Sequence, residues 1–350
     1  MSTQRGRIRI SGFDTERVEQ RDSLSGWVED TGTEAEGRWK RAIRRFRRNR
    51  SAMLGLVVVG AMVLATVFAR PITIQEIGVT VQPFSVAPYP PGDSLLFDTS
   101  TNVEDYAPPS LDPFHPMGTD GTARDVFSRV LYGGRFSISI GFIVVFATAT
   151  IGVVYGSISG YYGGWVDEIM MRFLDVIFAF PGLVLALVIV AMLGKGYFQL
   201  LLAFTVFGWA GYARLIRGEI LSIKQNEYVL AARALGARDR SVIFRHIVPN
   251  AIAPVIVQAS LSVGTVVIGV AALGFLGLGF ETTASEWGTM LNAEQGTLSP
   301  GPGGDIYWWV TVFPGLAIFL FVMSMNLIGD GINDALDAQE DTTVTQGGGG

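Results

Sequence analysis

The most constraining feature of this 350-residue sequence is a series of long apolar runs that contain no charged residue. A helix needs roughly 18 to 20 apolar residues to cross about 30 Å of hydrocarbon. Five runs meet this requirement: Ser51–Ala69, Phe136–Val166, Gly196–Ala213, Ala251–Phe280 and Ile306–Gly329. A sixth run, Phe173–Gly194, is interrupted only by Asp175. The sequence therefore predicts an all-α membrane protein with six transmembrane helices.

The composition agrees with a membrane protein and excludes several functions. Charged residues make up 16% of the chain and the mean hydropathy is +0.39, whereas soluble domains carry about 25% charged residues. The net charge of −5 argues against nucleic acid as a partner. There is no cysteine and there are only two histidines, His115 and His246, so thiolate and histidine-rich metal sites are excluded. We expect no metal and no cofactor.

Catalytic signatures are missing too. The sequence contains no phosphate-binding G-x-x-x-x-G-K-[ST] loop, no H-E-x-x-H motif and no G-x-S-x-G elbow. Only Asp175 lies inside a predicted span, three residues after Arg172. An ion pair between these two residues is the simpler explanation, and a place in a substrate pathway is the alternative. We expect a protein without enzymatic activity.

Basic residues predict the orientation, because Lys and Arg concentrate on the cytoplasmic side. Residues 38–50 hold eight Lys or Arg and no acid, directly before the first span. Four spans later, residues 214–250 hold seven Lys or Arg and three acids. Both segments fall on one side of a six-span chain, which puts the N- and C-termini in the cytoplasm. The first apolar run begins too late for a signal peptide, so we expect it to be a retained anchor.

These observations divide the chain into segments. We expect 1–37 to be a disordered cytoplasmic tail and 38–70 a basic juxtamembrane segment with the first span. We expect 71–135 to be an extracytoplasmic loop, 136–334 a five-helix core, and 335–350 a flexible tail. Within 38–50, Trp39, Ile43 and Phe46 have near-helical spacing. That spacing fits a short helix on anionic lipid, and a plain orientation signal is equally compatible.

Glycines mark a packing face and several breaks. In the second span they recur at every fourth position, which lets another helix approach closely, either within this chain or from a partner chain. These helix-packing residues are Gly152, Gly156, Gly160 and Gly164. Gly274, Gly277 and Gly279 are expected to loosen the end of the fifth span. Pro181 and Pro314 predict kinks in the third and sixth spans.

The loop 214–250 is long enough to need its own structure. A helix is expected around Glu227–Leu235, stopped by Gly236 in a left-handed conformation. A second helix is expected from Asp239 to about Ile247, ended by Pro249. Two amphipathic helices joined at a glycine form a docking surface for a partner, and a loop resting on lipid is the alternative.

This loop resembles the EAA loop of ABC-importer permeases, in the dipeptide and oligopeptide branch. The resemblance is carried by Glu227–Ala237 and Phe244–Asn250 and by further motifs along residues 38–338. These further motifs are His115–Asp120, Arg124–Arg129, Tyr132-Gly133, Arg172–Asp175, Phe180-Pro181, Phe275–Gly279, Trp287-Gly288, Asn326–Gly331 and Asp334–Asp337. The basic segment and first span are similar to the second permease subunit of such peptide and nickel importers.

The resemblance implies a type-1 ABC importer permease in the plasma membrane, driven by ATP hydrolysis in partner subunits. The implied partners are a second homologous permease, two cytoplasmic ABC ATPases, an extracytoplasmic substrate-binding protein and the lipid bilayer. The substrate implied is a dipeptide or oligopeptide, although relatives carry nickel, sugars or opines. The residues implied in ATPase coupling are Glu227, Leu230, Ala231, Ala232, Arg233, Gly236, Ala237, Asp239, Val248 and Pro249.

Two positions depart from the family pattern. Leu230 stands where the family usually has the first Glu of its signature, and Val270 stands where a Glu is common. We expect Glu227 and Arg233 to supply alternative polar contacts to the ATPase. His246 is expected at the docking interface, and His115 is expected to be structural. A self-sufficient secondary transporter or channel is the alternative function, and the sequence shows neither its mid-membrane charges nor an internal repeat.

Overall fold

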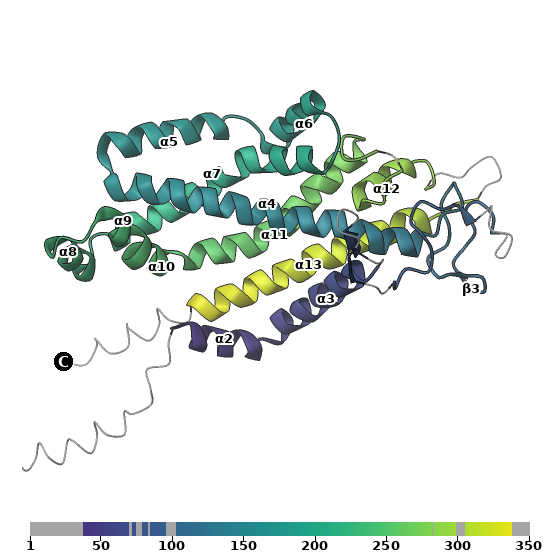
Figure 1. Ribbon diagram of the computed structural model, residues 1–350, viewed down its shortest axis with the longest axis horizontal. Helices are drawn as coiled ribbons and strands as arrows, with labels where there is room; N and C mark the ends of the chain where they lie inside the picture. The colour runs from purple at the N-terminus through teal and green to yellow at the C-terminus, as the bar shows by residue number, and fades with distance from the viewer. Residues whose placement is uncertain are drawn as a thin grey trace, which may run out of the picture.

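The computed structural model describes residues 38–69, 72–74, 79–82, 85–95, 103–281, 283–298 and 305–337. The predicted disordered tail 1–37 and most of the tail 335–350 lie outside these residues. The described part is an elongated bundle of helices with their long axes roughly aligned (Figure 1). One end carries α8 (Glu227–Ala234) and the other carries β3 (Ser110–Leu111), and we call them the α8 end and the β3 end.

The remaining elements follow in chain order. They are α2 (Arg38–Arg48), α3 (Arg50–Val67), β1 (Ile72–Ile74), β2 (Val79–Gln82), β4 (Phe114–His115), α4 (Val126–Tyr162), α5 (Gly164–Phe178), α6 (Gly182–Leu193), α7 (Tyr197–Ile223), α9 (Asp239–Ser241), η2 (Val242–Ile247), α10 (Val248–Ala251), α11 (Ala253–Phe275), α12 (Trp287–Ala293) and α13 (Trp309–Asp337).

Five described helices are long and apolar enough to cross a membrane: α3, α4, α7, α11 and α13. The sixth predicted span is present only as the pair α5 and α6, which is bent by 77° at the break. Pro181 lies in that break and is the N-cap of α6. Proline cannot donate a backbone hydrogen bond and disfavours helix in the residue before it, so the predicted kink is a full break. Helix α13, in contrast, continues through Pro314.

Two boundaries differ from the sequence prediction. Helix α4 begins at Val126, ten residues earlier than the predicted span, because the Asp125 side chain caps it by accepting from the Ser128 N–H at 2.8 Å. Helix α7 continues to Ile223, so the first ten residues of the predicted loop 214–250 are helical. A charge-free run underestimates a span whose ends carry polar side chains outside the apolar layer.

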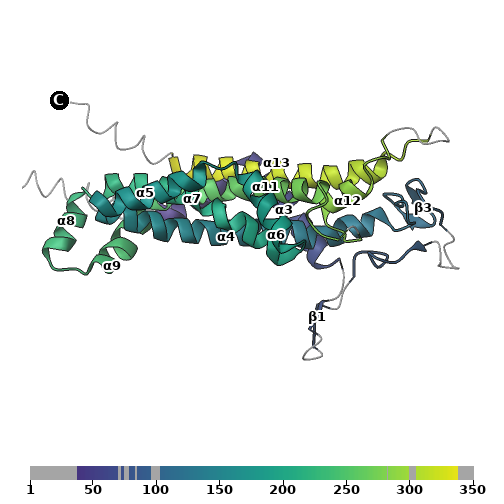
Figure 2. The same cartoon turned by 90° about the horizontal axis from the view of Figure 1, so that it is seen from above.

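Helix α4 lies at the centre of the bundle and packs against α3, α7, α11 and α13. Its apolar side chains enter two buried clusters. One cluster joins it to α11, α12 and α13 through Val263, Trp287 and Phe321. The other joins it to α6, α7 and α11 through residues such as Leu200 and Val270. Viewed from above, α13 and α11 cover one side of α4 (Figure 2).

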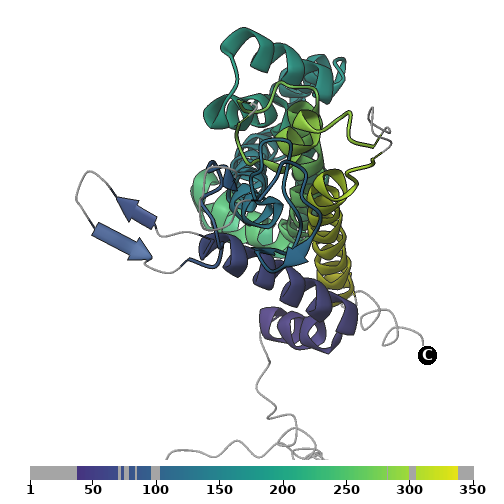
Figure 3. The same cartoon turned by 90° about the vertical axis from the view of Figure 1, so that its right-hand side faces the viewer.

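The segment before α4 is mostly irregular. Strands β1 and β2 form an antiparallel hairpin that projects away from the bundle (Figure 3). Strands β3 and β4 form a second, shorter hairpin at the β3 end, with a cis peptide bond between Asp112 and Pro113. Residues 103–125 fold back on the start of α13 and the residues before it: the Tyr106 ring stacks on Tyr307 at 4.1 Å, and the Trp309 indole donates to the Thr119 carbonyl at 3.0 Å.

Candidate functional site

The first candidate site is the exposed segment at the α8 end that comprises α8, α9, η2 and α10, which we call the turn. Helix α8 ends in two hydrogen bonds that close a Schellman motif: Gly236 N–H to the Arg233 carbonyl at 3.0 Å and Ala237 N–H to the Ala232 carbonyl at 3.1 Å. Gly236 has φ +80°, and no atom lies within 4 Å of where its Cβ would be. The predicted left-handed stop at Gly236 is confirmed, and its cause is backbone conformation rather than crowding.

Helix α8 exposes nearly all of its side chains. Val229 is fully buried and anchors the helix, whereas Leu230 is 49% exposed and Leu235, in the turn that follows, is 88% exposed. Most of the predicted coupling residues are also exposed, and Ala232, Ala237 and Val248 are half-buried. The exposed ones are Glu227, Leu230, Ala231, Arg233, Gly236, Asp239 and Pro249. The turn therefore presents a ridge with apolar and charged side chains and keeps one anchor in the bundle.

The second half of the turn contains a π-helix, η2. The prediction that a helix from Asp239 ends at Pro249 is wrong: α9, η2 and α10 run without a break to Ala251. In η2 the Val248 N–H bonds the Ile243 carbonyl, five residues back. Pro249 has no N–H and would crowd the preceding turn of an α-helix, and a π-turn gives its ring room. Val242, Ile243 and Ile247 are buried, as their spacing predicts.

The turn is attached to two long helices. Val229, Val242 and Ile247 pack in one cluster with Ile216 and Ile220 of α7. The hydroxyl of Tyr161, at the end of α4, donates to Asp239 Oδ1 at 2.7 Å. The Arg233 guanidinium lies 5.9 Å from the centre of the same Tyr161 ring. The turn is therefore attached to α4 and α7 together. His246 is half-buried at this turn, and its carbonyl accepts from the Asn250 side chain at 2.7 Å.

The glycine stripe explains how α4 and α7 stay together. A Cβ at Gly152 would lie 2.6 Å from the Trp209 carbonyl oxygen, and one at Gly156 would overlap the Ala213 carbonyl. A Cβ at Gly160 would lie 3.1 Å from the Arg217 carbonyl oxygen. These three glycines pack within the chain. Gly164 does not belong to the face: it begins α5, has φ +55°, and has open space around it.

Two ion pairs connect α5 to α7. The two carboxylate oxygens of Asp167 accept hydrogen bonds from Arg217 Nε and Nη2, each at 2.6 Å. Asp175 Oδ1 accepts a hydrogen bond from Arg214 Nη2 at 2.8 Å. The expected pair between Arg172 and Asp175 is absent, because Arg172 instead pairs with Glu168 one turn away at 3.2 Å. Helix α7 offers Asp175 a guanidinium across the interface.

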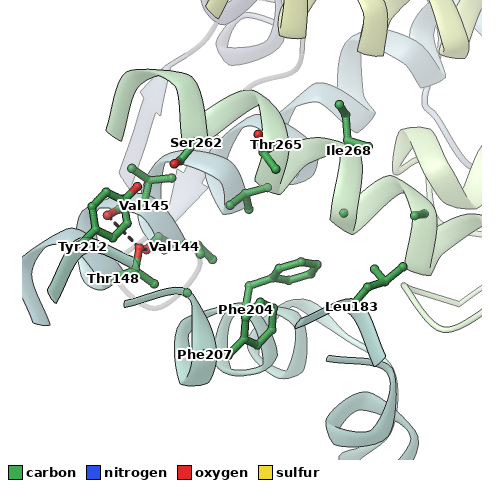
Figure 4. Close-up of a pocket in the computed structure, with 14 residues that line it drawn as sticks. Val144, Val145, Thr148, Leu183, Phe204, Phe207, Tyr212, Ser262, Thr265 and Ile268 are labelled. Carbon is green, nitrogen blue, oxygen red and sulfur yellow. Dashed lines mark hydrogen bonds between the residues drawn. The ribbon is translucent and has the colours of Figure 1, made fainter. Parts of the chain in front are cut away.

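A cavity of about 390 Å³ lies between α4, α6, α7 and α11 (Figure 4). Its lining residues carry no charge, and its polar groups are the hydroxyls of Thr148, Tyr212, Ser262 and Thr265. Phe204 and Phe207 form part of the opposite wall. Among the described residues, none accepts or donates a hydrogen bond to the buried Tyr212 hydroxyl within 3.5 Å. The cavity is an apolar space with a few hydroxyl groups at one side.

The β3 end holds a buried network of charges that the sequence pattern does not predict. Asp120 is 1% exposed and contacts Arg129, which is equally buried, and Arg124 at 2.8 Å. Burial alone raises the pKa of Asp120, but the charges of Arg129 and Arg124 and backbone hydrogen bonds outweigh it and lower the pKa. Arg129 also donates to the Ala284 carbonyl at 3.1 Å, which fixes the loop before α12.

Two buried glutamates complete this end. Glu286 is fully buried, caps α12 by accepting from the N–H groups of Gly288 and Thr289 at 2.9 and 2.8 Å, and accepts from the Ser137 hydroxyl at 3.2 Å. Burial raises the pKa of Glu286 despite these bonds. Glu294 accepts from the Tyr106 hydroxyl at 3.0 Å. Burial and the Glu294 charge raise the pKa of Tyr106 to about 12. His115 is also buried, which fits its expected structural place.

Comparison with known proteins gives one consistent result. Residues 152–340 match the family model of the binding-protein-dependent transport system inner membrane component. Residues 37–109 match the N-terminal TM domain of oligopeptide transport permease C. Both models describe transport proteins, and together they cover most of the chain.

Two curated relatives align over 299 residues, which is 85% of this chain. The dipeptide transport system permease protein DppC of Alkalihalophilus pseudofirmus is 36% identical, with 89% of its length covered. The glutathione transport system permease protein GsiD of Escherichia coli is 40% identical, with 90% covered. Among solved structures, the inward-facing MetNI methionine ABC transporter is 16% identical, with a TM-score of 0.45 over 58% of this chain and 96% of that chain.

Proposed function

Because the chain belongs to the family of binding-protein-dependent transport system inner membrane components, we propose that it imports peptides with ATP hydrolysed by partner subunits. It is an ABC transporter permease of the plasma membrane with type-1 architecture. The turn formed by α8, α9, η2 and α10 receives the motion of an ATPase. The partners are two cytoplasmic ATPases, a second homologous permease and an extracytoplasmic binding protein.

The orientation of the chain supports this assignment of ends. The basic helix α2 and the turn after α7 lie at the same end of the bundle (Figure 1). Lys and Arg concentrate on the cytoplasmic side of a membrane. The α8 end therefore faces the cytoplasm, where the ATPases are, and the β3 end faces the binding protein. Both chain termini are cytoplasmic in this orientation.

One observation carries the coupling proposal: the turn exposes apolar side chains on its outer side, and its buried side is attached to α7 and α4. Leu235 and Leu230 are 88% and 49% exposed, which is costly in water and favourable in a groove of a partner. Val229 and the Tyr161–Asp239 hydrogen bond hold the turn on α7 and α4. Docking energy of the ATPase can therefore favour one arrangement of the long helices over another.

The cavity between α4, α6, α7 and α11 is our choice for a section of the transport path. Its hydroxyl groups can bond the amides of a peptide, and the absence of charge from its lining prevents tight retention of either peptide terminus. The relatives are named for dipeptide and glutathione transport. Short peptides are therefore the substrate class we assign to this chain.

The decisive experiment is purification of the tagged chain from its host in mild detergent, with measurement of the ATPase that co-purifies. Leu235→Asp should reduce the recovered ATPase at least tenfold, because a charge would enter an apolar groove. Leu111→Asp is the matched control, since Leu111 is 77% exposed at the other end. Gly236→Glu should likewise abolish coupled uptake while the chain remains inserted.

The opposite outcome is equally clear. A stable chain that repeatedly purifies without an ATPase, or uptake that survives both Leu235→Asp and Gly236→Glu, would favour a self-sufficient transporter. Loss of ATPase in the Leu111→Asp control would show that the effect is not specific to the α8 end.

A further inference from the structure

The basic helix α2 borders an apolar groove that no part of the proposed transport cycle uses. The groove has a volume of about 190 Å³, and only apolar side chains line it within the described part of the chain. Helix α2 contributes Ile43 and Phe46, the first turn of α11 contributes Ile256, and the last turns of α13 contribute Ile332 and Leu336. The groove lies at the α8 end, where these two spans begin and end.

The groove is incompletely filled by the protein. Ile43 lines it and is still 58% exposed. Exposing a large apolar side chain beside an apolar hollow is unfavourable in water, and covering it with hydrocarbon removes that cost. A polar ligand would gain nothing from these walls. The lining therefore selects an apolar chain, and its place at the end of two spans gives access to the acyl region of the inner leaflet.

The charges around the groove specify the rest of the ligand. Helix α2 rotates by 100° per residue, so its apolar face is centred between Ala42, Ile43 and Phe46. Arg45 and Arg47 project about 100° to either side of that centre, and Arg41 and Arg48 project from the opposite side. All four arginines are exposed, and none pairs with an acid among the described residues. Two cations therefore flank the mouth of an apolar groove.

We propose that this groove is a binding site for an anionic phospholipid, with an acyl chain against Ile43, Ile256 and Leu336 and the phosphate between Arg45 and Arg47. Arginine reaches the headgroup level by extending its apolar stem along the surface and binds phosphate oxygens in pairs. The bound lipid joins α2 to the ends of α11 and α13. This site is independent of the proposed peptide transport.

The test is native mass spectrometry of the full-length chain with its partner subunits, titrated with phosphatidylglycerol or phosphatidylcholine of identical acyl chains. The wild-type protein should bind phosphatidylglycerol with at least about fivefold higher affinity than phosphatidylcholine. Leu336→Trp fills the groove and should remove most of this binding. Leu316→Trp, on an exposed position of the same helix, is the matched control and should leave it unchanged.

Charge variants separate the site from general attraction to the membrane. R45Q/R47Q should lower phosphatidylglycerol affinity at least fivefold and leave phosphatidylcholine binding unchanged. R41Q/R48Q removes the same charge from the opposite side and should cost less than twofold. Equal losses in both pairs, or full lipid retention in Leu336→Trp, would overturn the proposal. A tenfold gain of lipid affinity on removal of residues 1–36 would also overturn it, by identifying that segment as the occupant.

Discussion

Arg217 and Asp167 form a two-pronged ion pair in which the guanidinium of α7 donates to both carboxylate oxygens of α5 at 2.6 Å. Helix α5 (Gly164–Phe178) has a single buried residue, Leu174, and both Gly163 before it and Gly164 at its start have positive φ. The pair contributes to holding α5 against α7, together with the Arg214 guanidinium, which lies 4.2 Å from the centre of the Phe178 ring. It has a neighbour in the pair between Arg214 and Asp175, one to two turns further along the interface.

Loss of the Asp167 pair should loosen α5. Spin labels at Trp165→Cys and Gly218→Cys can report the distance between α5 and α7, because the chain has no other cysteine. We expect Asp167→Asn to broaden the distribution of distances between the two spin labels, measured by pulsed electron paramagnetic resonance. Glu168→Gln breaks the exposed Glu168–Arg172 pair within α5 and is the control. Equal broadening in both variants would contradict an anchoring role for Asp167.

Removal of the Asp120 charge should destabilise the β3 end, because Arg129 would be left buried without a counter-charge. Breaking such a pair costs about 3 kcal/mol, or a fall in Tm on the order of 10 °C. We expect this fall for Asp120→Asn at pH 7, measured by tryptophan fluorescence during heating. Asp105→Asn, an exposed acid in the same segment, should change Tm by less than about 2 °C.

The same pair predicts a dependence on pH. The folded pKa of Asp120 lies below its ordinary value of 3.8, so its stabilising contribution is present above that value and is lost as the pH falls through the folded pKa. The difference in Tm between wild type and Asp120→Asn should therefore be constant from pH 7 to about pH 5 and should shrink below pH 3.8. A difference that is unchanged at pH 3 would rule out this linkage.

A side chain at Gly156 should separate α4 from α7, because its Cβ would overlap the Ala213 carbonyl. Overpacking of this kind costs about 1 to 3 kcal/mol. We expect Gly156→Ala to lower Tm by several degrees and to reduce the yield of monodisperse protein. Gly60→Ala is the matched helical control, with open space around its Cβ, and should be neutral or slightly stabilising. An unchanged Tm for Gly156→Ala would mean that the two helices can shift apart freely.

Filling the cavity should block transport without uncoupling the ATPase. Thr265 lines the cavity from α11, and Thr265→Trp would place an indole in the space of about 390 Å³. We expect uptake by the reconstituted complex to fall at least tenfold while ATPase co-purification is retained. Thr150→Trp makes the same change at an exposed position of α4 and should leave uptake intact. Normal uptake in Thr265→Trp would remove the cavity from the transport path.

Much of the fold could be predicted because it depends on short stretches of sequence. Long charge-free runs predict spans, since backbone groups in hydrocarbon must bond within their own helix. Gly236 predicts a helix stop because only a residue without Cβ adopts φ +80° at little cost. Pro181 predicts a kink, but the full break with its bend of 77° depends on how α6 packs against α7.

The candidate site was only partly predictable. The exposed turn was expected from its sequence pattern. The π-helix at Val242–Ile247 was not, because the pattern predicts that the helix ends at Pro249, whereas in the structure the helix continues through Pro249. Asp120, Arg129 and Glu286 were not identified as a buried network. Their sequence separation exceeds one helical turn, so no local pattern marks them as partners.

The sequence by itself determined the membrane-spanning character, the basic α8 end, the glycine face of α4 and the stop at Gly236, because each follows from residues within a few turns of one another. Tertiary structure decided which groups meet. It paired Asp175 with Arg214 instead of Arg172, placed α7 against Gly152 and Gly156, and buried Arg129 on Asp120. The physical reason is that a charge or a small residue constrains its neighbourhood strongly but selects a distant partner only when packed helices bring both within contact distance.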